Sequence, residues 1–528
     1  MIRRPLIQTI PFALCFVLLG FVPLQAAENT GDLEQRVKQL EQQLTELKTL
    51  LQAEKEEEEK EKAAEAAKPA EPEKPAGMTL LGKGTLQVGG DIRFRPEYFD
   101  NVWDYNDDGA TEDSREVIRF RPRVFLDWKP ADNMEAYIRM TKEWVYGQDN
   151  EHFGYDVEGK DAMFDNAWGE WKDIYGSGVN LRIGRQDLIY GEGFVVLDGT
   201  PQDGSQTISF DAAKLTVNHD LGATDLLFAK MVELNSQLAD DEDLYGIYNK
   251  LTFDQVEGLG LEPYFLSRSK RARANITGAP GTVSYPFSPY DPSPREQTYL
   301  VGMRATYKTD IATDVTLALA AEGGKEFGQV EFTGSPVLDY ANLAATSSGY
   351  SRNAANDVDR DAWGGYINGT LTFNAVPWKP SFKAGVTYFS GDDPSTEDYE
   401  GWDDFYAQWP KYSELYVYTL YDGFKFATRG NDPEVGMWSN MIIPEAMITV
   451  KPTDRLTQSL RYLYYLAEES IGPGGGDERG HNLQWLTQYV FTDNLSGHFL
   501  GEWFAPGDFY GPDADDAFYA RIELMYKF

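Results

Sequence analysis

The chain has 528 residues, a formal net charge of −37 and one cysteine, which excludes a disulfide framework and argues against binding to nucleic acid. Its 49 Gly, 31 Tyr, 29 Phe and 12 Trp accompany a mean hydropathy of −0.47. This composition is typical of many strands in which only every second residue is apolar, as in a transmembrane β-barrel.

Residues 1–27 have the pattern of a secretory signal peptide. A short basic start precedes an apolar run that is interrupted by Pro11 and Pro23 and is too short to span a bilayer. Ala26 and Ala27 then offer a cleavage site. Cys15 lies inside this segment, so we expect the mature chain to contain no thiol.

Residues 28–53 predict a short coiled-coil helix, because apolar residues recur there at alternating spacings of four and three. They are Leu33, Val37, Leu40, Leu44, Leu47 and Leu51. Two interpretations stay open: self-association through residues 33–51, or a single helix that docks elsewhere. Residues 54–78 are charged and rich in Ala and Pro, which indicates a solvated linker without a core of its own.

Residues 79–528 predict an all-β fold, a transmembrane antiparallel β-barrel of about 18 strands. Eight short turns, such as WKPADN (128–133) and VKPTDR (450–455), alternate with nine longer polar connections. An even strand number places both chain ends on the short-turn side, which is periplasmic in bacterial outer-membrane barrels. The coil is therefore expected in the periplasm. The sequence leaves open whether residues 390–440 hide an extra hairpin, at ELYVYTLY or FKFATR.

The last strand, AFYARIELMYKF (517–528), alternates an aromatic and aliphatic face with a polar face. The apolar face is expected to contact outer-membrane lipid and lipopolysaccharide. The final Phe528 resembles the signal by which the barrel-assembly machinery recognises outer-membrane barrels.

Arginines alternate with apolar residues along several predicted strands. Arg119, Arg121 and Arg123 alternate with Ile118 and Phe120, as do Arg93, Arg139, Arg182 and Arg304 with their own apolar neighbours. An arginine on the lipid face would cost about 2–4 kcal/mol at mid-bilayer, so these side chains are expected to point inward. They could form a cationic stripe that attracts anions, or they could be paired internally with carboxylates.

The long connections carry most of the negative charge and two further candidate features. Asp104, Asn106 and Asp108 have the spacing that opens a calcium-binding loop, although Arg115 replaces the bidentate Glu that would complete it. No other cofactor is indicated. Aromatic residues between 402 and 416 could contact a glycan. The four histidines have no catalytic or metal-binding spacing, so an enzyme is not expected.

The stretch VNLRIGRQDLIYGEGFVVLDGTPQDGSQTISFDAAKLT (179–216) resembles the alginate-export family of outer-membrane porins, chiefly through Arg182 to Tyr190. The resemblance implies an 18-stranded, monomeric barrel whose arginine-lined constriction passes an anionic polysaccharide. It implies a selective wall formed by Arg93, Arg119, Arg121, Arg139, Arg182 and Arg185. The coil and linker lie outside the family pattern and leave the oligomeric state open, while the acidic loops leave the charge of the substrate open.

Three functions are therefore weighed for a protein of the bacterial outer membrane. The first is a channel for an anionic polysaccharide or a small organic anion. The second is a general or nutrient-uptake porin whose internal charges are paired. The third is a surface scaffold with a plugged barrel. The identity of the solute and the direction of transport are not determined by the sequence.

Overall fold

The computed structural model describes residues 84–102, 105–106, 114–146, 162–197, 210–232, 242–270, 295–331, 357–393, 396–407, 411–418, 438–470, 472 and 474–528. The predicted signal peptide, coil and charged linker lie outside these residues. So do Asp104 and Asp108 of the predicted calcium loop, and the FKFATR segment.

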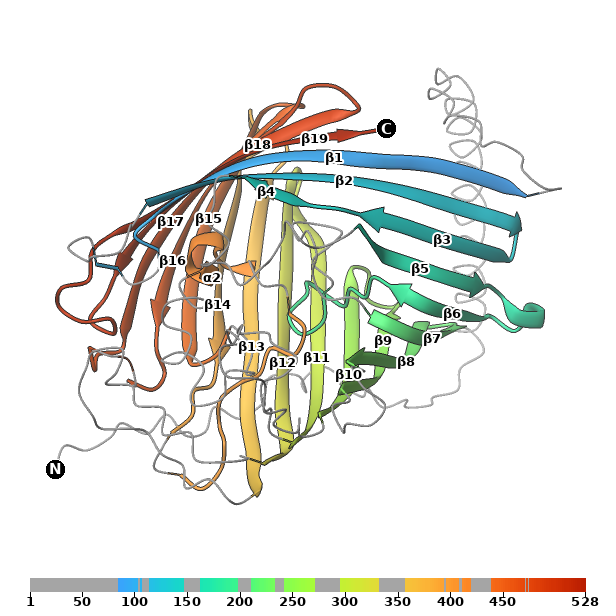
Figure 1. Cartoon of the computed structure of the whole chain (residues 1–528), viewed down its shortest axis with the longest axis horizontal. Helices are drawn as coiled ribbons and strands as arrows, with labels where there is room; N and C mark the ends of the chain where they lie inside the picture. Colours follow the sequence, from blue (N-terminus) through green and yellow to red (C-terminus); the bar gives the residue numbers. More distant parts are fainter. Residues whose placement is uncertain are drawn as a thin grey trace, which may run out of the picture. The chain divides into compact units, whose positions relative to one another are not determined.

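The described chain forms one antiparallel sheet (Figure 1). Its strands are β1 (Thr85–Asp100), β2 (Ser114–Ala131), β3 (Met134–Thr141), β4 (Trp144–Tyr146), β5 (Met163–Trp171), β6 (Val179–Gln186), β7 (Phe210–His219), β8 (Gly222–Val232), β9 (Glu242–Thr252), β10 (Leu259–Lys270), β11 (Arg295–Ala312), β12 (Val315–Glu331), β13 (Asp357–Phe373), β14 (Ser381–Phe389), β15 (Met441–Thr453), β16 (Leu456–Leu466), β17 (Glu478–Val490), β18 (Leu495–Pro506) and β19 (Ala517–Lys527). Two short helices are η1 (Ile174–Gly176) and α2 (Glu414–Tyr418).

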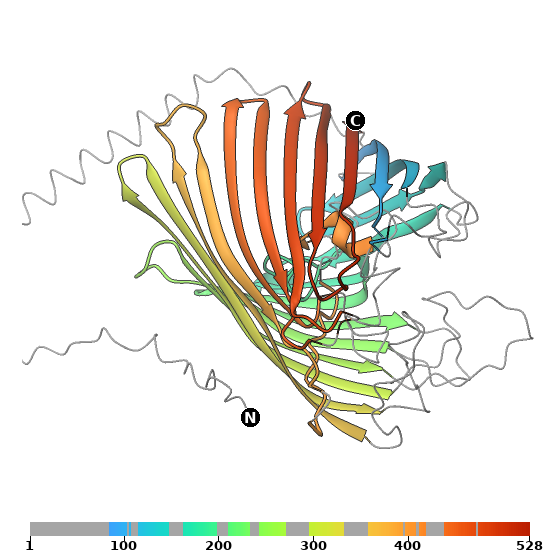
Figure 2. The same cartoon turned by 90° about the vertical axis from the view of Figure 1, so that its left-hand side faces the viewer.

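The predicted count of 18 strands is confirmed. The segments β3 and β4 both pair with β2 and are separated only by Lys142 and Glu143, so they form one interrupted wall strand. The remaining connections alternate between short turns at one end and long loops at the other, at the predicted places. Figure 2 shows this for the strands coloured orange to red, whose short turns lie together at one end.

The barrel closes between its first and last strands. Ile92 pairs with Tyr526 and Asp100 with Phe518, and Phe528 exchanges two backbone hydrogen bonds of 3.0 Å with Gly90. A closed ladder leaves no strand edge with unpaired backbone groups, which is what the apolar interior of a membrane demands.

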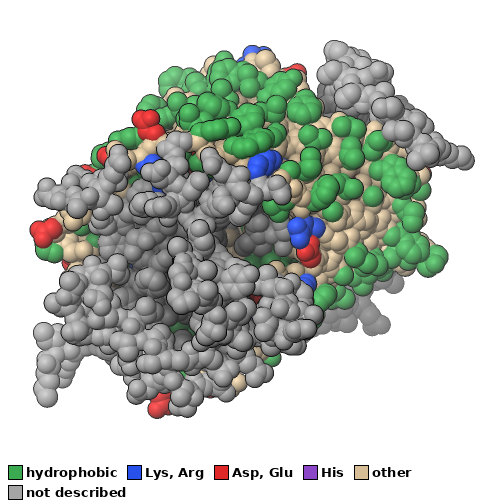
Figure 3. All heavy atoms as spheres, in the orientation of Figure 1, with side chains coloured by type: hydrophobic (Ala, Val, Ile, Leu, Met, Phe, Trp, Pro, Cys, Tyr) green, Lys and Arg blue, Asp and Glu red, His purple; other side chains and the backbone are tan. Residues whose placement is uncertain are grey.

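The outer face of the wall is apolar, as the alternation predicts. In β2, Val124, Leu126 and Trp128 are exposed on this face, and Ile522 and Leu524 are exposed in β19. In Figure 3, hydrophobic side chains gather over the outer face of the neighbouring strands β1, β2, β3 and β5. None of the described helices is long and apolar enough to cross a membrane.

The hydrophobic core lies inside the barrel rather than between layers. Phe194 stacks on Phe389, with ring centroids 5.5 Å apart, and contacts Trp402 at 5.8 Å. Phe194 and Trp402 belong to loops, whereas Phe389 belongs to strand β14. Loops therefore fold inward and pack on the wall. The ELYVYTLY segment contains helix α2 over Glu414–Tyr418 instead of part of a hairpin.

The seam between β1 and β19 gives a test of the terminal residue. We expect Phe528→Asp to reduce the yield of membrane-embedded, heat-modifiable barrel while secretion continues, because a charge replaces the ring beside Gly90 at the closing edge. The measurement is electrophoresis with and without boiling, on membrane fractions.

The matched control is Phe491→Asp, which places the same charge in the short turn between β17 and β18, away from the seam. A normal yield of heat-modifiable Phe528→Asp protein would contradict the role assigned to the terminal strand.

Candidate functional site: the inner wall of the barrel

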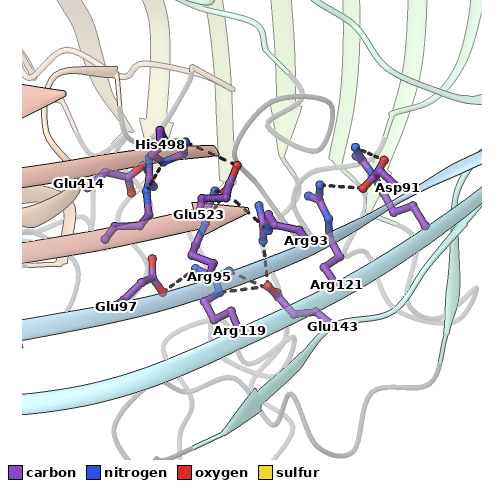
Figure 4. A network of polar contacts seen from close by, with 12 residues as sticks. Asp91, Arg93, Arg95, Glu97, Arg119, Arg121, Glu143, Glu414, His498 and Glu523 are labelled. Carbon is purple, nitrogen blue, oxygen red and sulfur yellow. Dashed lines mark hydrogen bonds and ion pairs between the residues drawn. The ribbon is translucent and has the colours of Figure 1, made fainter. Parts of the chain in front are cut away.

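Arginines crowd the inner wall beside the closing seam (Figure 4). The register of β1 and β2 places Arg93 opposite Arg121 and Arg95 opposite Arg119, while Asp91 faces Arg123. Like charges opposite one another on a sheet repel. This arrangement therefore requires acids from neighbouring elements.

Three carboxylates provide that compensation. Glu143 accepts hydrogen bonds from Arg93 at 2.9 Å and from Arg119 at 3.1 Å, Glu523 accepts one from Arg95 at 2.7 Å, and Asp91 accepts one from Arg123 at 2.8 Å. Arg93 and Arg121 are wholly buried. The predicted inward direction of these arginines is observed, and so is the internal pairing that was the alternative to a free cationic stripe.

Three further predicted wall residues, Arg139, Arg304 and Arg182, also form ion pairs with carboxylates. Arg139 contacts Asp165 at 2.9 Å and Asp187 at 3.3 Å, and Arg304 contacts Glu262 at 2.8 Å. Arg182 contacts Glu170 at 2.9 Å and lies over the ring of Trp168, with its guanidinium carbon 3.9 Å from the ring centroid.

Arg185 lies on the opposite face of β6 from Arg182. It shares its side of the strand with the exposed Ile183 and forms an ion pair of 2.7 Å with Asp211, which also points outward. The expectation that Arg185 belongs to the inner wall is therefore wrong. The alternation that turns Arg182 inward necessarily turns a residue three positions later outward.

Residues 187–197, after β6, fold into the barrel. Tyr190 donates a hydrogen bond of 3.2 Å to Asp225 and stacks on Tyr248, with ring centroids 4.1 Å apart. Gly191 and Gly193 have positive φ angles, 56° and 71°, and a side chain at either position would meet a neighbour closer than 3.0 Å. The glycine spacing of the YGEGF motif is therefore required by a tight inward turn.

Residues 399–407, after β14, form the second inward segment and contact the first. Tyr406 and Leu197 are joined by a backbone hydrogen bond of 2.7 Å, and Tyr406 also bonds to Val195 at 2.9 Å. The two loops therefore support each other across the interior.

A buried group of charges holds the second loop to the wall. In this loop anchor, Asp403 contacts Arg268 at 3.1 Å and Arg360 at 3.5 Å. Glu296 and Glu326 complete the compensation, with Glu296 2.7 Å from Arg268 and Glu326 3.1 Å from Arg360. All five side chains are at most 2% exposed. A buried ion group of this kind tolerates no missing partner.

Helix α2 is also fastened to the wall. Ser413 caps it by accepting a hydrogen bond of 2.9 Å from the Tyr416 amide, and the Ser413 hydroxyl donates to Glu502 of β18 at 2.5 Å. Glu414 forms an ion pair of 2.5 Å with Arg521 of β19. The connection between β14 and β15 is therefore tied to the wall at two places, at Asp403 and at helix α2.

The wall exposes cations more than carboxylates. Two loop carboxylates that pair with wall arginines are well exposed, Asp187 at 25% and Glu192 at 39%. Among the ion pairs formed within the inward-facing strands and their short turns in the described structure, however, no carboxylate side chain is more than 17% exposed, the value for Glu262. Seven cations of such pairs, in contrast, are exposed between 17% and 48%. They are Arg119, Lys129, Lys172, Arg182, Lys214, Lys383 and Arg461.

Lys411 adds a cation from the inward loop that sequence reasoning did not identify. Its Nζ donates a hydrogen bond of 2.6 Å to the Glu192 carbonyl and lies 5.8 Å from the Tyr366 ring centroid. Burial, helped by Lys383 and Arg461, lowers the pKa of Lys411 to about 8 against the opposing effect of Glu192 and Glu322. Nothing in the local sequence KYSELY marks this residue, because its partners come from distant elements.

The loop aromatics expected to contact a glycan are placed differently. Trp402, Tyr406, Tyr412 and Tyr416 are buried inside the barrel, so their rings are covered by the wall and by each other. The structure therefore offers no exposed ring of these four residues for the suggested glycan contact. Of the predicted calcium ligands, only Asn106 is described, so that site stays a prediction.

Comparison with known proteins identifies the relatives of this barrel. A sequence model of the family described as alginate export matches residues 85–522. Comparison with curated proteins gave no match.

Solved structures similar to this chain include two from Pseudomonas aeruginosa and one from Acinetobacter baumannii. Pseudomonas aeruginosa OccK5 (OpdH) is 13% identical, with a TM-score of 0.46, 83% of this chain covered and 97% of that chain. Acinetobacter baumannii OccAB1 is 13% identical, with a TM-score of 0.49 and coverages of 84% and 96%. Pseudomonas aeruginosa OpdK, solved with vanillate, is 11% identical, with a TM-score of 0.47 and coverages of 84% and 98%.

The loop anchor gives a test of how the inward segment is held. We expect Asp403→Asn to speed amide hydrogen exchange in residues 403–407 and to expose Lys411 to trypsin, because loss of one partner of a buried ion group costs about 3–5 kcal/mol. The strand ladder should survive, as shown by unchanged heat-modifiability.

The control is Asp361→Asn, which removes the partner of Lys325 in an exposed pair on the outer face and should cost about 0–1 kcal/mol. Equal exchange rates in the two variants would show that the anchor does not hold the loop.

Proposed function

Because the chain belongs to the alginate-export family of outer-membrane barrels, which are transport channels rather than enzymes, we propose that it conducts an acidic polysaccharide or organic anion. The observation that carries the proposal is the unequal exposure of paired charges on the inner wall. A solute inside the barrel meets the cations Lys129, Lys172 and Arg182 before it meets their carboxylates.

The pairing of each cation with a carboxylate does not cancel its attraction for a nearby anionic solute. The Coulomb energy falls with distance, so an anion close to an exposed guanidinium or ammonium group is attracted more than it is repelled by the carboxylate behind it. The acidic outer loops act over a screened distance of about 8–10 Å in physiological salt. The wall is therefore expected to dominate selectivity where the passage is narrowed by the inward loops.

A second candidate function is a general or nutrient-uptake porin. It is favoured by the buried pairs, since Arg93 and Arg121 have no exposed surface to offer a solute. Polymer block separates the two functions, because a channel for small nutrients has no reason to bind a long polyanion. A plugged scaffold, the third candidate, would show no conductance.

The proposal includes the surroundings of the barrel. The chain ends on the short-turn side, which is taken as periplasmic, so the coil of residues 28–53 would lie in the periplasm and could associate with other copies. Phe528 would present the assembly signal to the barrel-assembly machinery, and the apolar outer band would contact lipid and lipopolysaccharide.

The proposed selectivity is tested in planar bilayers under a salt gradient. We expect the wild-type reversal potential to indicate anion preference, and the triple variant Arg119→Gln, Lys383→Gln, Arg461→Gln to shift it toward cations. A change of about 1 kcal/mol in the free-energy difference between anion and cation inside the barrel would change the anion-to-cation ratio about fivefold.

The matched control removes three cations from the outer face, Arg185→Gln, Lys230→Gln and Lys325→Gln, and should leave the reversal potential nearly unchanged. A wild-type channel that prefers cations, or a control that shifts selectivity as much as the inner-wall triple, would refute the proposal.

Lys411 predicts a pH dependence of this selectivity. With a pKa of about 8, the amine is mostly charged at pH 7 and mostly neutral at pH 9, so anion preference should fall over this interval. Lys411→Arg keeps the charge and should remove the step, while Lys411→Met should give at pH 7 the selectivity that the wild type reaches at pH 9. A step that persists in Lys411→Met would assign the titration to another group.

A further inference from the structure

Three exposed cations form a continuous row across the wall near the short turns. This cationic ladder consists of Lys129, Lys172 and Arg182. Lys129 lies close to the end of β2, Lys172 directly follows β5, and Arg182 lies in the first half of β6. All three therefore lie toward the end of the barrel that carries the short turns. Their side chains are 48%, 40% and 25% exposed.

Two less exposed carboxylates join the members of the ladder. Glu135 lies 3.6 Å from Lys129 and also contacts Lys172. Glu170 lies 3.8 Å from Lys172 and 2.9 Å from Arg182. The carboxylates therefore fix the spacing of the cations and remain behind them, at 13% and 9% exposure.

Arg182 is the member of the ladder that packs on an aromatic ring. Its guanidinium lies on the Trp168 ring and is tied to Glu170 by one hydrogen bond. Trp168 in turn stacks on Tyr137, and Tyr137 on Phe125, with centroid distances of 5.5 and 5.7 Å. This inward aromatic row holds the guanidinium plane in place, which suits recognition of a planar carboxylate.

We propose that the cationic ladder is the docking site at which a polymer with regularly repeated carboxylates enters the barrel from the short-turn side. The inference rests on the proposed function. It adds where on the wall the polymer binds, from which side it enters and that several of its carboxylates bind at once. Asp127 also lies 3.3 Å from Lys129, so with Glu135 and Glu170 three carboxylates balance the three cations. A single solute carboxylate therefore gains little from one cation, as in an exposed ion pair. A polymer that contacts several members at once gains through effective concentration.

The test uses single channels in planar bilayers, with polygalacturonate as the polymer and galacturonate at equal carboxylate concentration as the monomer. Orientation is assigned by Asp513→Cys in the loop between β18 and β19, labelled with a membrane-impermeant biotin and detected by streptavidin. We expect the polymer to block from the short-turn side and the monomer to leave the current unchanged.

The triple variant Lys129→Gln, Lys172→Gln, Arg182→Gln should lower the polymer block rate from the short-turn side about tenfold or more, with little change from the loop side. Arg182→Lys keeps the charge without the planar stack and should lose part of the affinity. The outer-face triple Arg185→Gln, Lys230→Gln, Lys325→Gln is the charge-matched control and should block like the wild type.

Unchanged block in the ladder triple, equal loss from both sides, or equal block by the monomer would overturn the inference. None of these three results would by itself refute the proposed function. An anion-selective wild type whose polymer block ignores the ladder refutes only the docking site, whereas a cation-selective wild type refutes the channel proposal itself. Heat-modifiability of each variant confirms that a folded barrel is being compared.

Discussion

The membrane imposes the constraint on which this structure depends: every strand must be paired, and every residue facing lipid must be apolar. Charged side chains in the middle of the strands are therefore driven inward, where they must compensate each other, whereas outward charges such as the pair Arg185–Asp211 lie near strand ends and are paired there. Lysine and arginine have longer stems than aspartate and glutamate, and they extend their charged groups toward water. A wall with balanced charges can therefore present a cationic surface, as it does at Lys129, Lys172 and Arg182.

The inward loops explain why the densest arginine group is not the most accessible one. A barrel of 18 strands is wide, and here its interior is occupied by residues 187–197 and 399–407, which pack against each other and against the wall. Arg93 and Arg121 lie in a buried network, where each guanidinium must have acid partners. Their ion pairs join β1, β2, β19 and the junction of β3 and β4, while contact with solute is left to more exposed cations such as Arg119.

Alternation made the wall predictable from sequence, because lipid on one side enforces the period of two along every strand. It gave the strand number and the inward direction of Arg119, Arg121 and Arg123. Arg185 was assigned inward through the family resemblance, although alternation with Ile183 pointed the other way. The inward loops, the loop anchor at Asp403 and the position of Lys411 depend on contacts between residues far apart in sequence, and no local period encodes them.

The distribution of charge along the barrel bears on how a passive channel would handle a polyanion. Under the proposed function, the acidic composition of the long connections and the exposed cations near the short turns would make capture of a polyanion faster from the short-turn side. This asymmetry cannot by itself drive net movement, since a passive site that speeds capture from one side also retains the polymer more strongly there. The direction of flux would follow the concentration gradient. Neutralisation of the cations by Asp127, Glu135 and Glu170 would then matter, because weak individual contacts would allow a captured polymer to move on.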